Sequence, residues 1–338
     1  SGADRFTWKV NDGRDDSAVA VVTIVVDGQR SGKAGQKAKF YFPPPGEALA
    51  NQARRKPEEA GLKPEVIGQL RALMKNGRWA LWRHGYLVHV EGDFNQTTEV
   101  ASLRKTWHAM AVGAAIKQGK IPSYKQKLSV WNRELTGKDA EATWRHVITQ
   151  TSGFDYPYGD FPALKPGEIW TYSDKNPKQL CNALARVYGK KDYRDNYDEV
   201  IRQAYFDAIG MRGWTSSAQD DGIRFQFDLE DMGRLGLLAL ARGRWNGVEV
   251  IPQWFVEELE KKQTRGIRAN YDGPDDGRPK GGWLHSRPRP GRSQTDLHRP
   301  GRSHRIQLEG HLRLRHDHAK DPRTLDIPLI YLLYASVI

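Results

Sequence analysis

Ser102 and Lys105 are the two residues of this 338-residue chain whose types and spacing best suit nucleophilic catalysis. They open the stretch 100–120, VASLRKTWHAMAVGAAIKQGK, which has a helical pattern of small and apolar residues and ends at Gln118 and Gly119. Residues three apart share a helix face, so a serine hydroxyl would lie beside an amine on the first turn. Such a pair suits a nucleophile and its base, at a helix N-terminus where free N–H groups favour negative charge.

The Ser-x-x-Lys spacing is a weak signal when it is taken alone. With 14 Ser and 22 Lys in the chain, chance supplies about one such pair. A second reading makes Ser102 an ordinary helix N-cap and Lys105 a residue that faces solvent. The neighbouring sequence has to decide between the two readings.

Composition indicates a globular protein, with 38% hydrophobic and 28% charged residues. No apolar run reaches the roughly 18–20 residues that cross a bilayer, so we expect no membrane span. The net charge of +12 is uneven, because residues 284–320 alone carry +6, with six of the ten His and no aromatic residue. Basic and aromatic residues are therefore not interleaved, and we expect no nucleic-acid partner.

The chain divides into four predicted regions. Residues 1–30 form a β-strand segment that resembles the end of an extracellular immunoglobulin-like or cadherin-like repeat; an extra hairpin of the main domain is the equal alternative. Residues 31–61 are rich in Gly, Lys and Pro and form a linker or a surface wrap. Residues 62–283 hold the main domain, and residues 284–338 form an Arg- and His-rich tail that is out of frame or of unrelated origin.

Within the main domain the patterns predict a helix at 64–77, a hairpin at 79–92 and then the helix of Ser102. His84 and His89 are assigned to the turn and the sheet of that hairpin. The single Cys181 excludes an internal disulfide and is expected to be a buried apolar residue of a helix. Further elements are expected in this order: a helix ending at 151–153, a strand and helix over 169–190, helices within 199–211 and 228–247, and a strand-turn-helix over 248–263.

Several short motifs occur in the same order as in a known superfamily. They are the Ser102–Lys105 motif with its small-residue helix, the turn 148–154 with Gln150 where the family has His, the stretch from Lys165-Pro166-Gly167 to Tyr172-Ser173-Asp174, and the segments 206–211 and 231–236. In these residues the chain resembles the serine β-lactamase and penicillin-binding superfamily. The nearest group is class C β-lactamases, D-alanyl-D-alanine peptidases and related esterases.

The resemblance implies an α+β fold, with an antiparallel sheet flanked by helices plus an all-helical lobe. It also implies a serine hydrolase that forms an acyl-enzyme on Ser102, with Lys105 or Tyr172 accepting the serine proton. An amine or a phenol can accept this proton near neutral pH only where burial or a neighbouring positive charge lowers its pKa. The substrate would be a small ester, amide or β-lactam, with no cofactor or metal, and the location periplasmic or extracellular.

Asp174 departs from the family, which has Asn at this position. Its carboxylate adds a negative charge beside the cleft and is expected to pair with Lys105 or Lys175. We expect it to disfavour anionic substrates such as β-lactams, so neutral esters and amides are favoured. Asp174 is therefore the predicted substrate-binding residue.

The third motif of the family, a Lys- or His-x-Gly on the sheet edge, is not visible after Trp283. His311, His316 and His318 have no recognisable metal-ligand spacing. The tail is expected to be loosely held, and only the segment 325–338 reads as an apolar strand. In the family this motif supplies one of two oxyanion donors, and losing one such donor costs about 10²–10³ in rate. The chain is then a weak hydrolase or, alternatively, a non-catalytic ligand-binding protein; its natural substrate and oligomeric state stay open.

Overall fold

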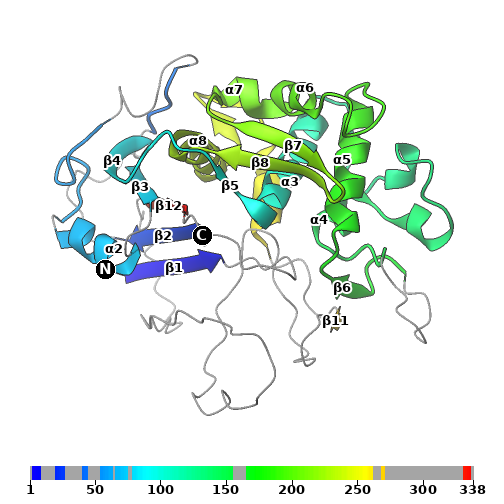
Figure 1. Cartoon of the computed structure of the whole chain (residues 1–338), viewed down its shortest axis with the longest axis horizontal. Helices are drawn as coiled ribbons and strands as arrows, with labels where there is room; N and C mark the ends of the chain where they lie inside the picture. The colour runs from blue at the N-terminus through cyan, green and yellow to red at the C-terminus, as the bar shows by residue number, and fades with distance from the viewer. Residues whose placement is uncertain are drawn as a thin grey trace, which may run out of the picture.

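The computed structural model is an α+β structure of helices and small, mostly antiparallel sheets (Figure 1). It describes residues 2–8, 20–26, 40–44, 54–63, 65–74, 78–154, 165–261, 268–270 and 330–335. The fold class expected from the sequence is confirmed. None of the helices in these ranges is long and apolar enough to cross a bilayer.

The hairpin predicted at 79–92 is present as β3 (Arg78–Arg83) and β4 (Tyr86–Glu91), and α2 (Glu65–Met74) precedes it. Strand residues alternate between the two faces of a sheet. Trp79 and Leu81 accordingly pack in one apolar cluster with α2, whereas Trp82 packs in the main core. β12 (Ile330–Ala335) pairs with the other edge of β3, so the apolar end of the tail adds the expected strand.

The turn of this hairpin is covered by a piece of the region predicted to be a linker. Tyr41 donates its N–H to the His84 carbonyl at 2.8 Å. Gly85 is in the left-handed region (φ 84°), and a Cβ on it would lie 1.9 Å from the Tyr41 carbonyl oxygen. Arg54 forms a β-bridge with Leu87. The described parts of residues 31–61 therefore wrap the hairpin.

The two strands predicted in residues 1–30 are β1 (Gly2–Trp8) and β2 (Ala20–Val26). They pair antiparallel, with Gly2 opposite Val26 and Trp8 opposite Ala20. The division of the chain into four regions stays a prediction.

A second three-stranded sheet leads the chain into the helix of Ser102. Its strands are β5 (Thr98–Glu99), β8 (Gly222–Phe227) in the centre and β7 (Thr215–Gln219). Val100 continues the pairing after β5 by donating to the Phe225 carbonyl at 3.1 Å. A single 3₁₀ turn, η1 (Ala101–Leu103), and the helix α3 (Arg104–Lys117) follow directly.

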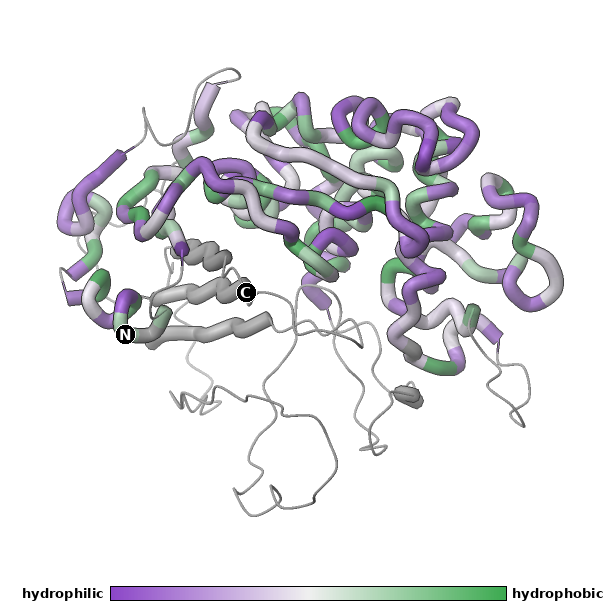
Figure 2. Tube along the Cα trace, in the orientation of Figure 1, coloured by the Kyte–Doolittle hydropathy of each residue, from purple (hydrophilic) through white to green (hydrophobic). Residues whose placement is uncertain are grey.

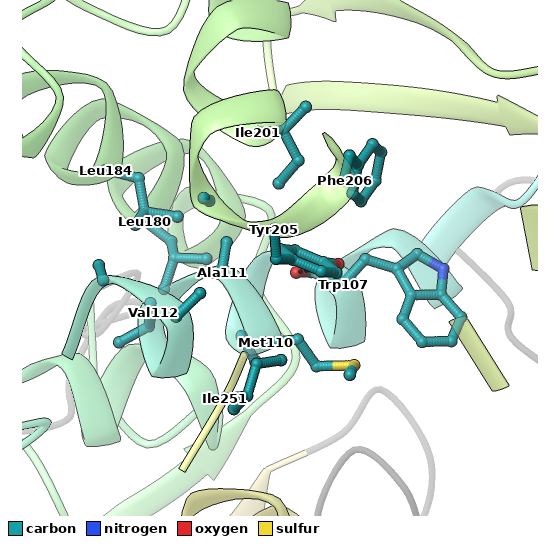
Figure 3. Packing of buried hydrophobic residues seen from close by; sticks show 14 of the residues in the cluster. Trp107, Met110, Ala111, Val112, Leu180, Leu184, Ile201, Tyr205, Phe206 and Ile251 are labelled. Carbon is teal, nitrogen blue, oxygen red and sulfur yellow. Dashed lines mark hydrogen bonds between the residues drawn. The ribbon is translucent and has the colours of Figure 1, made fainter. Parts of the chain in front are cut away.

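α3 is the central helix of the fold. Its residues from Arg104 to Ala115 are all buried, and a helix that is buried all round needs small residues where its neighbours approach. Gly113 shows this, since a Cβ there would lie 2.5 Å from the Phe255 ring of α9 (Gln253–Glu260). Figure 3 shows α3 side chains, among them Met110 and Val112, packed among apolar residues of several other elements.

Hydrophilic residues predominate on the outlying loops and helices (Figure 2). α3 contacts β8, α9 and several of the remaining described elements. The remaining elements are η2 (Leu128–Val130), η3 (Gly137–Glu141), α4 (Trp144–Ile148), β6 (Ile169–Thr171), α5 (Lys175–Val187), α6 (Tyr197–Ile201), the π-turn η4 (Arg202–Phe206), α7 (Asp207–Ile209), α8 (Leu229–Leu240), β9 (Arg244–Trp245), β10 (Val248–Glu249) and β11 (Arg268–Asn270). β6 and β11 pair in parallel. The helix expected within 199–211 is interrupted by a π-turn, and Cys181 is fully buried in α5, as predicted.

Candidate active site

The backbone around Ser102 is bent sharply between β5 and α3. Ala101, the residue before it, is in the left-handed region with φ 42°. A non-glycine residue seldom adopts this conformation, and such strain is concentrated at functional sites. Ser102 lies in the 3₁₀ turn, is 6% exposed, and occupies the N-cap position of neither η1 nor α3. The N-cap reading is therefore wrong.

Lys105 lies in the first turn of α3 and points inward. It is 3% exposed, so the reading of a solvent-facing lysine is also wrong. Its Nζ lies 2.8 Å from the Ser102 Oγ and 2.5 Å from the Tyr172 hydroxyl. The amine thus bonds to two hydroxyl groups at once.

Tyr172 reaches the same point from the loop between β6 and α5. Its hydroxyl is hydrogen-bonded to the Ser102 Oγ, and the centre of its ring is 4.5 Å from the Lys105 Nζ. The serine, the lysine and the tyrosine predicted to be catalytic are thus mutually hydrogen-bonded, although 67 residues separate Lys105 from Tyr172.

The surroundings of Lys105 favour a neutral amine. Burial lowers the pKa of Lys105 well below its usual value, and the neighbouring Arg104 guanidinium lowers it further. Asp174 and Asp221 act in the opposite direction. A neutral amine has a lone pair, so it can accept a proton from a hydroxyl group.

Behind Lys105 lies a chain of charges that sequence reasoning missed. Arg104, 2% exposed, donates to Asp221 at 2.6 Å, and Arg224 bonds to the same carboxylate at 2.9 Å. Burial opposes ionisation of Asp221, but the two guanidinium groups hold its pKa below the usual range. No local pattern signals this network, because its members meet only when β8 packs against α3.

Asp174 lies at the N-cap position of α5 and is exposed. Lys175 bonds to Asp139 at 3.1 Å, so the alternative that Asp174 would pair with Lys175 is not what the structure shows. Asp174 acts on Lys105 through its charge, by raising the pKa of the amine. It thus carries its negative charge beside the three hydrogen-bonded residues.

Among the described residues, no group of three or more His, Cys, Asp or Glu side chains is placed to hold a metal ion. His311, His316 and His318 lie outside the described residues, as does the region expected to hold the third motif.

The Beta-lactamase family model matches residues 66–226, a little under half of the chain, and the matched part includes Ser102, Lys105 and Tyr172. This segment is β-lactamase-like. The match confirms the resemblance to the serine β-lactamase and penicillin-binding superfamily that the motifs indicate. Members of this family are serine hydrolases, and this is the broad class of function that the match supports.

Solved structures of this type resemble the chain distantly. A β-lactamase from Mycobacterium bovis is 18% identical, with 65% of this chain and 73% of that protein covered and a TM-score of 0.48. A class C β-lactamase from Rhodobacter sphaeroides is 16% identical (59% and 71% covered, TM-score 0.46). A candidate 6-aminohexanoate-dimer hydrolase from Bacillus anthracis is 17% identical (64% and 66% covered, TM-score 0.49), so the chain spans about two thirds of that protein.

A search of curated protein sequences finds no match.

Proposed function

We propose that the protein is a serine hydrolase that transfers the acyl group of a small ester or amide to Ser102 and then to water. The observation that carries this proposal is the mutual hydrogen bonding of the Ser102 Oγ, the Lys105 Nζ and the Tyr172 hydroxyl, with the amine buried. A nucleophile within hydrogen-bond reach of a base, and the base oriented by a third group, is the arrangement that activates a hydroxyl.

Acylation uses these groups as follows. The neutral Lys105 amine takes the Ser102 proton, either directly or through the Tyr172 hydroxyl, while Oγ forms its bond to the substrate carbonyl carbon. The carbonyl oxygen becomes an oxyanion, for which the Ser102 N–H, in the 3₁₀ turn before α3, is the proposed donor. The proton then passes to the leaving alcohol or amine as its bond to the carbonyl carbon breaks. Water then attacks the carbonyl carbon of the acyl-Ser102 ester while Lys105 takes a proton from the water. The proton returns to the Ser102 Oγ as its bond to the acyl group breaks, which releases the acid.

The charge of Asp174 supports a preference for uncharged substrates. Its exposed carboxylate lies close enough to the site to raise the pKa of Lys105. An anionic substrate would approach this carboxylate against electrostatic repulsion. We therefore propose that neutral esters and amides react faster than β-lactams, which carry a carboxylate.

Steady-state hydrolysis of p-nitrophenyl acetate and of nitrocefin tests both parts of the proposal. We expect Ser102→Ala to lower kcat/KM for the acetate by at least about 10³-fold, since it removes the attacking atom. Ser123→Ala is the matched control, because the Ser123 Oγ accepts from the Lys125 N–H in its own turn. We also expect a higher kcat/KM for the acetate than for nitrocefin.

Equal hydrolysis by wild type and Ser102→Ala would overturn the serine mechanism. Hydrolysis by neither protein above the uncatalysed rate would favour a non-catalytic ligand-binding protein. A kcat/KM for nitrocefin as high as that for the acetate would overturn the role given to Asp174 alone.

A further inference from the structure

Gln150 has an unusual backbone conformation next to the candidate site. It follows α4 in the turn 149–153 and is in the left-handed region, with φ 59°. Its side chain is only 3% exposed. The Thr151 N–H closes the end of α4 on the His146 carbonyl at 2.8 Å, and the Thr151 carbonyl accepts from the Gly167 N–H at 2.7 Å. The left-handed conformation suits this helix end, and the buried side-chain amide needs hydrogen-bond partners in the interior.

The side-chain oxygen of Gln150 accepts two hydrogen bonds from the segment that carries Tyr172. Ser173, the next residue, donates its backbone N–H at 3.0 Å. Asn176, in the first turn of α5, donates its side-chain amide at 2.7 Å. One buried oxygen therefore holds both the exit of the Tyr172 loop and the start of the helix that follows.

The oxygen is the atom that matters in this contact. In the part of the chain that the structure describes, the Gln150 Nε2 is buried without a hydrogen-bond partner, whereas Oε1 serves two donors. Removing the oxygen would break both of these buried hydrogen bonds, which favours displacement of the loop.

The position of Tyr172 leaves little tolerance for such displacement. Its hydroxyl must stay within hydrogen-bond reach of both the Ser102 Oγ and the Lys105 Nζ, which lie on a separate element, α3 and the turn before it. A shift of about 1 Å in a reacting group is enough to lower a rate by about 100-fold.

We propose that Gln150 is a positioning residue whose side-chain oxygen holds the Tyr172 loop in register with Ser102 and Lys105. It acts through Ser173 and Asn176 rather than on the substrate. This inference rests on the proposed function for its effect on rate, but the contact itself can be tested without turnover.

The kinetic test compares three variants. Gln150→Met removes the acceptor, and we expect kcat for p-nitrophenyl acetate to fall about 10–100-fold with KM within about threefold. Gln150→Gly also removes the acceptor but relieves the left-handed backbone, so it should fold and show the same loss of kcat. Gln150→Glu keeps an acceptor and should retain most of kcat, while its charge raises the pKa of Lys105 and moves the acid limb of the pH profile upward.

Gln179→Met is the matched control. Gln179, on α5, also has a buried side-chain amide. Its Oε1 accepts a hydrogen bond from the Asn132 side chain at 2.8 Å and not from the Tyr172 segment. We expect this variant to keep kcat within about twofold. A kcat of Gln150→Met and Gln150→Gly within twofold of wild type, or an equal loss in Gln179→Met, would overturn the proposal.

Hydrogen exchange of the Ser173 amide separates this inference from the proposed function. We expect protection of that amide to fall in Gln150→Met and Gln150→Gly and to persist in Gln150→Glu and Gln179→Met. If wild type shows no Ser102-dependent turnover but protection follows this pattern, the proposed function fails and the positioning contact stands. If protection is unchanged in Gln150→Met, the positioning role is overturned whatever the activity.

Discussion

Lys105 and His108 lie one turn apart on α3, both are buried, and burial lowers the pKa of both. They differ in what their nitrogens contact. The His108 Nε2 bonds to the Ile223 carbonyl at 3.1 Å, and its Nδ1 lies 3.0 Å from the Tyr197 hydroxyl. A carbonyl oxygen only accepts, so Nε2 carries the proton and Nδ1 accepts from Tyr197.

Burial alone does not make either side chain reactive. Burial lowers the pKa of His108 to about 3, so its imidazole is neutral at pH 7, as a general base must be. Both of its nitrogens are nevertheless engaged within the core, and the ring packs on Phe225 at 4.9 Å. Lys105 instead contacts the hydroxyl of Ser102, which follows the strained Ala101. A perturbed pKa therefore marks a candidate base only where a nucleophile lies beside it.

The largest effect should come from Lys105, the member of this pair that we propose to be catalytic. We expect Lys105→Met to lower kcat/KM for p-nitrophenyl acetate by about 10³-fold or more, because the serine loses its base. Its thermal unfolding temperature should stay the same or rise, since a buried amine is replaced by an apolar chain. Lys117→Met on the same helix is the control, because Lys117 is exposed and pairs with Glu249. An equal loss in both variants would contradict the role of Lys105.

His108→Gln should show the opposite separation of rate and stability. We expect the folded variant to keep kcat within about threefold and to lose about 1–3 kcal/mol of unfolding free energy, as when a buried hydrogen bond is broken. Urea unfolding at pH 7 measures the loss. A large drop in kcat without a loss of stability would mean that His108 also belongs to the site and does not differ from Lys105 in role.

The pH dependence of stability sharpens the same prediction. The folded pKa of His108, about 3, lies below the unfolded value of 6.5, so between these values the unfolded state binds more protons. The contribution of His108 is present above pH 6.5 and is lost as the pH falls towards 3, at up to about 1.4 kcal/mol per pH unit. Urea unfolding of wild type and His108→Gln from pH 7 to 5 should give the steeper loss in wild type. Parallel curves would contradict it.

The smallest effect should come from Asp221, which offsets the charge of Arg104 beside Lys105. Asp221→Asn should lower the pKa of Lys105 further, so the acid limb of the kcat/KM profile moves to lower pH. Asp220→Asn is a close control, because Asp220 is exposed and pairs with Arg194 at the surface. A shift to higher pH would mean that the Asp221 charge does not raise the pKa of Lys105.

The sequence predicted the parts of this site that depend on local spacing. The β3–β4 hairpin follows from the strand period. Helical spacing offered the Ser102–Lys105 pair, and the resemblance singled it out as catalytic. Tyr172 was found only through the resemblance, because no local rule links it to a residue so far away in the chain. The contacts of Arg104 with Asp221 and of Gln150 with Ser173 could not be predicted, since they exist only once separate elements pack.

The most direct test of the central claim is mass spectrometry of the intact protein after reaction with a fluorophosphonate probe. The account predicts one adduct, mapped to Ser102, that is absent in Ser102→Ala, forms far more slowly in Lys105→Met and forms at the wild-type rate in His108→Gln. No adduct on wild type, or an adduct on another residue, would contradict it.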